Sequence, residues 1–159
     1  HILRTFGGSI LSIFHKLYNI ILFLFLNKLL VKFQMESNLK KILIVDDEIS
    51  ILKLLRHYLS EFYDVKVFSD GSEAFLWMQE GSLPDLIVAD IQMPTVDGLE
   101  FLKQLKMSEF YKSIPVIMLS SLDSSEDRIN YLKHGARDYL IKPFNPEELY
   151  IRIKKIFEN

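Results

Sequence analysis

The sequence contains no cysteine, which excludes disulfide bonds, thiol catalysis and cysteine-ligated zinc. This absence suits a reducing compartment, and we expect the protein to be cytoplasmic. The composition is not that of a disordered protein, because 49% of the residues are hydrophobic and 25% are charged. At 159 residues the chain is long enough for one domain with a sizeable core and too short for two comfortable ones.

Acidic residues are missing from residues 1–34, which carry four basic side chains: Arg4, Lys16, Lys28 and Lys32. The other 125 residues hold the remaining 15 basic and all 21 acidic side chains, so their net charge is −6. Non-specific nucleic-acid binding needs a basic face against the phosphates, so we expect no direct nucleic-acid partner. The first 34 residues and the body of the chain therefore differ in character.

A long uninterrupted apolar run is also missing. Residues 15–33 are strongly apolar, but their longest charge-free stretch, 17–27, has 11 residues and includes two Asn. A membrane-spanning helix needs about 20 apolar residues, so spanning would require Lys28 to be buried or to reach the interface. A secretory signal would place small residues after the apolar run, where this chain has Asn27 and Lys28.

Two interpretations of residues 1–38 stay open. The chain begins with His1 and its first methionine is Met35, so this apolar, basic extension could be upstream sequence from a misassigned start. Alternatively, it is a membrane anchor. We expect a domain over residues 39–159, and a membrane partner only if the extension is native.

From residue 39 the chain alternates short apolar runs with helical patterns. The runs predict strands at 41–45, 64–68, 86–89, 115–119 and 138–141. Apolar residues at three- and four-residue spacing predict helices at 49–62, 72–79, 99–107, 125–134 and 146–157. Short links between strands and helices favour a parallel sheet with helices on both faces.

The polarity of the strands predicts their order. Strand 64–68 alternates polar and apolar residues, which is typical of an edge. Strands 41–45 (after Lys41), 86–89 and 115–119 are apolar without alternation, which is typical of the interior. We therefore predict an α/β fold of the flavodoxin-like (βα)5 type, a doubly wound sheet with strand order 2-1-3-4-5.

The predicted strands end in side chains that carry chemistry, namely Asp46, Asp47, Asp90, Ser120 and Lys142. Each alone could have an ordinary role, such as a helix cap or a solvated lysine. In this fold, however, ligands bind beyond the carboxyl ends of the strands. Three carboxylates at one place repel unless a divalent cation neutralises them, and oxygen ligands without His or Cys favour Mg²⁺. The hydroxyl and the ammonium suit an incoming phosphoryl group.

Four segments carry a resemblance to a known family: ILIVDDE (42–48), LIVADIQMPTVDG (86–98), VIMLSS (116–121) and GARDYLIKPF (135–144). In this order and at this spacing, over roughly residues 40–157, the chain resembles the response-regulator receiver domains of two-component signalling, of the single-domain, chemotaxis-regulator-like kind. The resemblance implies that Asp90 is the phosphoacceptor. It also implies that Asp47, Asp90 and the backbone carbonyl of Gln92 bind Mg²⁺, and that Asp46 acts mostly through bound water.

The remaining roles follow from the same resemblance. Lys142, Ser120 and Ser121 would bind the phosphate, and Ser120 and Tyr139 would form the switch, with the aromatic ring turning inward on activation. A cis peptide is implied between Lys142 and Pro143. Tyr131 departs from the family pattern, since a small residue is common at that position, and Ser121 stands where many relatives have alanine.

The implied function is that of a phosphorelay protein. A sensor histidine kinase or phosphotransfer protein would donate the phosphoryl group, and the surface formed by 125–134, 138–141 and 146–157 would change and engage a downstream protein. Such a protein is not an enzyme beyond its own phosphorylation and dephosphorylation.

Two rival functions fit the sequence less well. A Mg²⁺-dependent phosphohydrolase with an aspartyl-phosphate needs a second acid two residues after the nucleophile, and Gln92 stands there. A binding-only module would lack Asp90, Lys142 or the acidic pair.

Overall fold

The structure is a computed structural model that describes residues 2–36, 39–94, 96–122 and 124–158, with the side chains of 2–11 and 33–36 left out. The chain forms two separate compact units, His1–Leu39 and Lys40–Asn159. The first contains one helix, α1 (Ile2–Glu36). Its segment Ser12–Lys32 is long and apolar enough to cross a membrane, by length and composition.

The second unit is built on a parallel sheet in the predicted order, β2-β1-β3-β4-β5. Its strands are β1 (Lys41–Val45), β2 (Asp64–Phe68), β3 (Leu86–Asp90), β4 (Val116–Ser120) and β5 (Asp138–Ile141). Its helices are α2 (Ile49–Leu59), α3 (Gly71–Gln79), α4 (Gly98–Met107), α5 (Ser125–Lys133) and α6 (Pro146–Glu158).

Most of the predicted bounds lie within one residue of these. The exception is the predicted helix 49–62, because α2 ends at Leu59. The amides of Phe62 and Tyr63 both donate to the carbonyl of Leu59 at 3.0 Å, which closes a turn toward β2. Apolar spacing continues through Phe62, so the pattern alone could not locate this turn.

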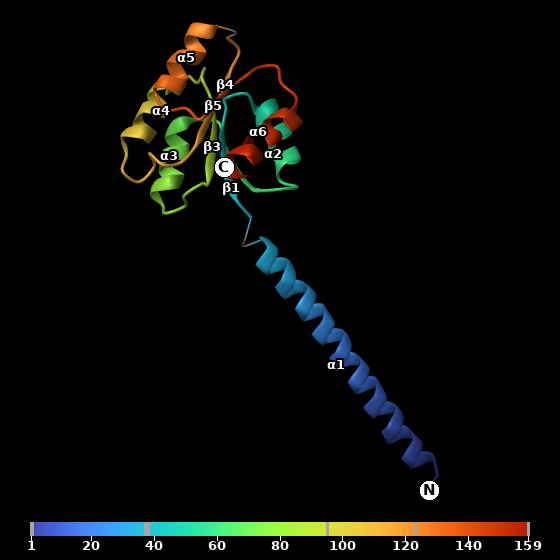
Figure 1. The fold of residues 1–159 in the computed structure, drawn as a ribbon. Coiled ribbons are helices and arrows are strands. Elements are labelled where there is room, and N and C mark those ends of the chain that lie inside the picture. The colour runs from blue at the N-terminus through green and yellow to red at the C-terminus, as the bar shows by residue number, and fades with distance from the viewer. Residues whose placement is uncertain (1, 37–38, 95, 123, 159) are drawn as a thin grey trace. The chain divides into compact units, whose positions relative to one another are not determined.

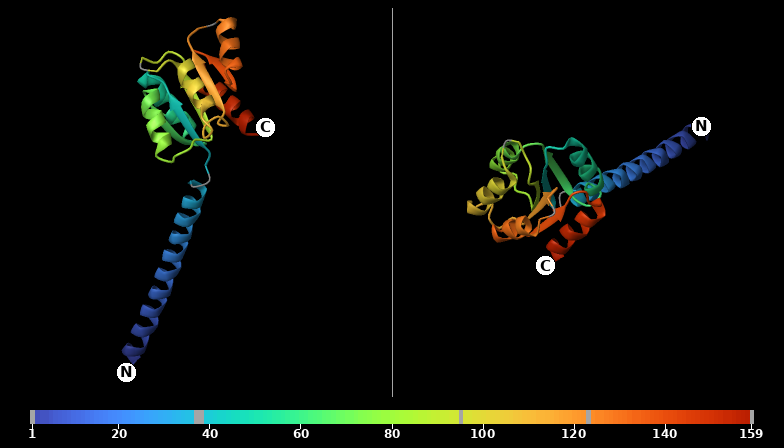
Figure 2. Two further views of the ribbon diagram at one scale, coloured as in Figure 1. Left: turned by 90° about the vertical axis from the view of Figure 1, so that its left-hand side faces the viewer. Right: turned by 90° about the horizontal axis from the view of Figure 1, so that it is seen from above.

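The helices form a layer on each face of the sheet (Figures 1 and 2): α3, α4 and α5 cover one face and α2 and α6 the other. Successive side chains of a strand point to opposite faces. In β1, Leu43 and Val45 pack in the core under α3–α5, whereas Ile42 and Ile44 pack under α2 and α6. All four are fully buried, which explains why β1 shows no polar alternation.

Hydrogen bonds continue the ladder beyond the strand ends and fix the site residues at one edge of the sheet. The amide of Asp46 donates to Phe68 (3.2 Å), and that of Lys142 donates to Ser120 (2.6 Å). The amide of Ile91, which follows Asp90, donates to Leu119 (2.9 Å). The residues that follow β1, β3 and β5 therefore lie together at one edge of the sheet.

Candidate functional site

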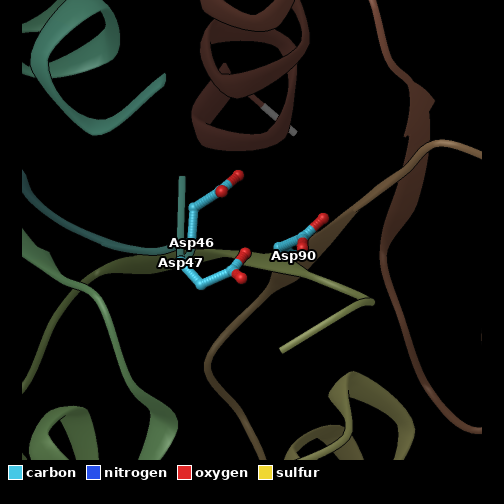
Figure 3. A group of neighbouring side chains, drawn as sticks. All are labelled: Asp46, Asp47 and Asp90. Carbon is cyan, nitrogen blue, oxygen red and sulfur yellow. The ribbon is translucent and has the colours of Figure 1, made fainter. Parts of the chain in front are cut away.

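Three carboxylates lie side by side at the carboxyl ends of β1 and β3. Asp46 and Asp47 follow β1, and Asp90 is the last residue of β3 (Figure 3). One carboxylate oxygen of each lies within 4.8 Å of the others. Asp46 is 0% and Asp90 3% exposed, whereas Asp47 is exposed to solvent. The site is thus an acidic pocket whose base is buried and which is open to solvent at Asp47.

Lys142 supplies the positive charge at this pocket. Its Nζ lies 2.7 Å from Asp46 Oδ2 and 2.9 Å from Asp90 Oδ1, and its side chain is 11% exposed. The Lys142–Pro143 peptide is cis, as the resemblance implied. One ammonium therefore pairs with two buried carboxylates.

The two oxygens of Asp46 have different surroundings. Oδ1 accepts a hydrogen bond from the amide of Glu48 (2.9 Å). Oδ2 is buried and receives no well-aligned hydrogen bond from the residues described, although the ammonium of Lys142 is close to it. The short distance makes this contact an ion pair, and its poor alignment leaves lone-pair capacity for a further partner such as a cation or its water.

The pKa values of the paired groups follow from burial and charge. Burial raises the pKa of Asp90; the hydrogen bond and charge of Lys142 oppose this, while Asp46 and Asp47 add to the rise. Burial by itself would lower the pKa of Lys142, but its close contacts with the carboxylates of Asp46 and Asp90 outweigh that effect and leave the pKa raised. Asp90 is thus a more basic carboxylate than an exposed one, beside a firmly protonated lysine.

Ser120 is fully buried at the end of β4, next to β3 in the sheet. Its Oγ accepts from the amide of Leu122 (2.9 Å) and lies 3.4 Å from the Leu122 carbonyl. The hydroxyl is therefore held by its own loop. Ser121 is exposed and lines a hollow together with Lys142.

Tyr139 points into the protein from β5. It is 5% exposed, and its hydroxyl donates to the carbonyl of Leu122 at 3.0 Å. Tyr131 of α5 packs beside it with the ring centroids 6.0 Å apart, and burial raises the pKa of Tyr131 to about 12. Through Leu122, one loop contacts both predicted switch residues, Ser120 and Tyr139.

The start of α4 packs tightly against the backbone of the acceptor strand. The amide of Gly98 donates to Ile91 (2.9 Å). A Cβ on Gly98 would lie 2.6 Å from both the carbonyl oxygen of Asp90 and the Cα of Ile91, closer than real Cβ atoms come to backbone. Only glycine fits at position 98, because the start of α4 comes so close to the backbone of Asp90 and Ile91. This close packing helps to position Asp90.

The structure brings four predicted residues, Asp46, Asp47, Asp90 and Lys142, into one cluster. The side chain of Gln92 is exposed, two residues beyond β3. Sequence reasoning missed the Leu122 carbonyl, because backbone acceptors have no sequence signal.

Sequence reasoning also missed Arg152. Its guanidinium contacts Glu148 and Asp138, each at 2.8 Å. The pair with Glu148 could have been predicted from its i, i+4 spacing on a helix, whereas the pair with Asp138 depends on the packing of α6 beside β5.

The family model for the response regulator receiver domain matches residues 42–154. The chain belongs to the response-regulator receiver family. This receiver is 46% identical over 118 residues to the alkaline phosphatase synthesis transcriptional regulatory protein PhoP of Bacillus subtilis, a match covering 74% of this chain and 48% of PhoP. It is 45% identical over 123 residues to the probable transcriptional regulator ycf27 of Cyanophora paradoxa, covering 77% and 50%. The chain spans about half the length of these curated relatives.

Comparison with solved structures supports the same family. The chemotaxis response regulator CheY4 of Vibrio cholerae is 37% identical, with a TM-score of 0.70, over 75% of this chain and 99% of that one. The receiver domain of Francisella response regulator 1452 is 39% identical, with a TM-score of 0.68, over 75% and 97%. The relatives are regulators, and the alternative of a phosphohydrolase is not supported.

Proposed function

We propose that the receiver takes a phosphoryl group onto Asp90 from a phosphohistidine of a sensor kinase or phosphotransfer protein. An Asp90 carboxylate oxygen attacks the phosphorus, and the N–P bond breaks with its electron pair left on the imidazole. The observation that supports this assignment is the pairing of buried Asp90 with Lys142 at 2.9 Å inside a cluster of three carboxylates. Burial makes Asp90 more basic, and Lys142 lies where it can pair with the incoming phosphate.

We further propose that Mg²⁺ is the cation of this site, held by Asp47, Asp90 and the backbone carbonyl of Gln92, with Asp46 acting through water. The donors fit this ion, because the cluster offers only oxygen ligands and Asp46 Oδ2 has coordination capacity left. When bound, the ion would neutralise the charge that develops on the transferring phosphoryl group. The carboxylates would then orient the acceptor rather than repel the donor.

A hollow of about 570 Å³ at Lys142, the partner of the acceptor, supports a protein donor. Half of its lining residues are apolar and half are polar or charged: Ile51, Leu54, Pro143 and Phe144, and Glu48, Ser50, Ser121 and Lys142. Apolar side chains around a charged reaction centre fit an interface with a polar catalytic group in the middle. We place this encounter in the cytoplasm, where a chain without cysteine is at no disadvantage.

Phosphorylation is proposed to act through Ser120 and Tyr139. Because the hydroxyl of Ser120 is held by Leu122, its turning toward a phosphoryl group on Asp90 would release the same loop that accepts from Tyr139. A change in that loop, next to α5, would alter the surface made by α5, β5 and α6 and its affinity for a downstream protein. A solved relative, the DrrB receiver domain, is described as activated by BeF₃ (32% identity, TM-score 0.68).

The acceptor is tested with acetyl phosphate and Mg²⁺, reading intact mass and alkali lability. The wild type should gain one phosphoryl group, and Asp90→Asn should gain none. Asp85→Asn is the matched control, because Asp85 precedes the same strand at its opposite end and should leave labelling intact. Labelling of Asp90→Asn, or labelling that needs no divalent cation, would refute the assignment.

The switch is tested by adding beryllofluoride and following amide signals by NMR. In the wild type, signals should shift at Ser120 and Tyr139 and along α5. Ser120→Ala should still accept phosphate but lose the shifts at Tyr139 and α5. If those shifts persist undiminished in Ser120→Ala, the proposed coupling is wrong even where the acceptor is right.

A further inference from the structure

The first unit exposes an unusual amount of apolar surface. Every large apolar side chain of α1 from Ile13 to Val31 is at least 40% exposed, and none of the segment Ser12–Lys32 is buried. Water-soluble monomers rarely expose contiguous apolar surface on this scale. A helix that is apolar on all sides is typical of a protein core or of a membrane span, and α1 is the one element described in its own unit, so that unit has no core to cover it.

We propose that α1 spans a lipid bilayer containing anionic lipids and tethers the receiver to its surface. The segment Ser12–Lys32 has 21 residues, which corresponds to about 31 Å of helix. The hydrocarbon core of a bilayer is about 30 Å thick. The apolar part of α1 therefore has the length of one crossing.

Two lysines within this segment, each four residues from one of its ends, are compatible with a crossing. Lys16 and Lys28 are separated by 12 residues, or about 18 Å along the axis. To place both ammonium groups at the edges of a core about 30 Å thick, each side chain must reach about 6 Å outward. Lysine side chains snorkel to the interface in this way.

Polarity along the segment also follows depth. Residues 20–26 are seven consecutive apolar residues, and Asn19 and Asn27 flank them symmetrically. Tyr18 lies one residue beyond Asn19, in the zone where tyrosine is enriched at membrane interfaces. The most apolar part of the helix would therefore sit at the middle of the bilayer.

The positive charge of residues 1–34 favours anionic lipid headgroups at both ends of α1. Residues 1–34 carry four basic and no acidic side chains, while the remaining residues carry a net charge of −6. Anionic lipids would attract the ends of α1 and repel the rest of the chain. Attachment of the protein to such a membrane must therefore come from α1 alone.

A helix lying flat on the membrane surface needs a continuous polar face, and α1 has none. At about 100° per residue, Lys16 and Lys28 project about 120° apart, and the apolar Ile20 and Leu24 project between them. The arrangement of α1 therefore favours spanning over surface binding.

The proposal is tested with the full chain reconstituted from detergent into vesicles of phosphatidylcholine and phosphatidylglycerol. After flotation, the wild type should remain with the vesicles through washes with high salt and with alkaline carbonate. Ile21→Glu/Leu24→Glu, which puts two charges at the bilayer centre, should be recovered in solution. Leu76→Glu/Met107→Glu is the matched control, because it removes two exposed apolar side chains from the receiver (61% and 83% exposed) and should float as the wild type does.

The depth of α1 in the same vesicles is measured by tryptophan fluorescence. The variant Phe23→Trp/Trp77→Phe has its one tryptophan in α1. Quenching should be strongest with lipids brominated near the ends of their acyl chains. Strongest quenching by shallow bromines, or release by high salt, would show a surface-bound helix and overturn the proposal. A wild type that associates with itself and stays out of the vesicles would also overturn it, since a second copy would then cover α1.

Discussion

Replacing Lys142 with methionine should destabilise the receiver strongly when no divalent cation is present. The substitution removes the only positive charge that contacts Asp46 and Asp90 among the residues described, while it keeps most of the apolar stem. Both carboxylates are buried, with side chains 0% and 4% exposed. They would be left as neighbouring buried negative charges.

Breaking a buried ion pair by removing one partner costs about 3–5 kcal/mol, because it leaves an uncompensated buried charge. A surface pair is worth only about 0–1 kcal/mol. The pair between Lys40 and Asp85 is of that kind, with a 3.0 Å contact between side chains that are 58% and 36% exposed. Lys40→Met is therefore the matched control and should change the free energy of unfolding by less than about 1 kcal/mol.

The effect should also depend on pH. Asp90 has a raised pKa in the folded receiver, so the stability associated with its protonated form is present at low pH and lost as pH rises through that pKa. The charge of Lys142 holds this pKa down, and the methionine variant should have a still higher one. Lowering the pH should favour the protonated Asp90 and relieve part of the repulsion, so the deficit of Lys142→Met should be smaller at about pH 5 than at about pH 7.5.

The assays are urea unfolding and thermal unfolding of residues 35–159 in the presence of a chelator, each followed by circular dichroism. For a domain of this size, 1 kcal/mol corresponds to roughly 3–4 °C, so the melting temperature should fall by about 10–20 °C at neutral pH. Added Mg²⁺ should recover stability by mass action, more in Lys142→Met than in wild type, since the pocket of the variant is more negative. If Lys142→Met loses no more than Lys40→Met, or its deficit is independent of pH, the electrostatic account of the site is wrong.

Two further substitutions address the surroundings of the site. Gly98→Ala should destabilise the receiver by about 1–3 kcal/mol despite the better helix propensity of alanine and should slow phosphorylation, because its Cβ would displace the backbone at Asp90. Gly71→Ala is the comparison, because its Cβ would meet side chains only, the nearest being the Phe101 ring at 3.1 Å; equal phosphorylation rates in the two variants would contradict the prediction. Tyr139→Phe should lose the hydrogen bond to Leu122, about 0.5–1.5 kcal/mol in urea unfolding, and unchanged stability would show that the bond contributes nothing.

The sheet order was predictable because the burial of a strand determines which residue types it contains. Apart from the site residues at their carboxyl ends, strands buried on both faces contain no polar residue, as in residues 42–45, whereas Lys66 in β2 reveals an edge that is open to water. The acidic cluster was predictable for a related reason. Strand ends of a parallel sheet meet at one edge, so Asp46, Asp90 and Lys142 could be brought together from strand positions alone.

Contacts that depend on side-chain direction or on backbone acceptors were not predictable. The Ser120 hydroxyl turns to its own loop rather than to Asp90, because that loop offers the amide of Leu122 at 2.9 Å. The close approach of Gly98 to the Asp90 carbonyl depends on how α4 packs against β3. Glycine at the start of a helix also occurs as a simple cap or turn residue, so its presence in the sequence does not indicate a tight contact.

The charges of the pocket explain why the acceptor, the lysine and a divalent cation belong together. Three ionised carboxylates and one ammonium leave a formal charge of about −2, which would repel a phosphoryl donor. A bound divalent cation would bring this charge to about zero, so that the donor could approach. Transfer would then replace the single negative charge of Asp90 with about −1.5 to −2 on the phosphoryl group. The new negative charge lies next to Lys142 and near the end of β4, and the Ser120 hydroxyl is a neutral donor that can turn to it.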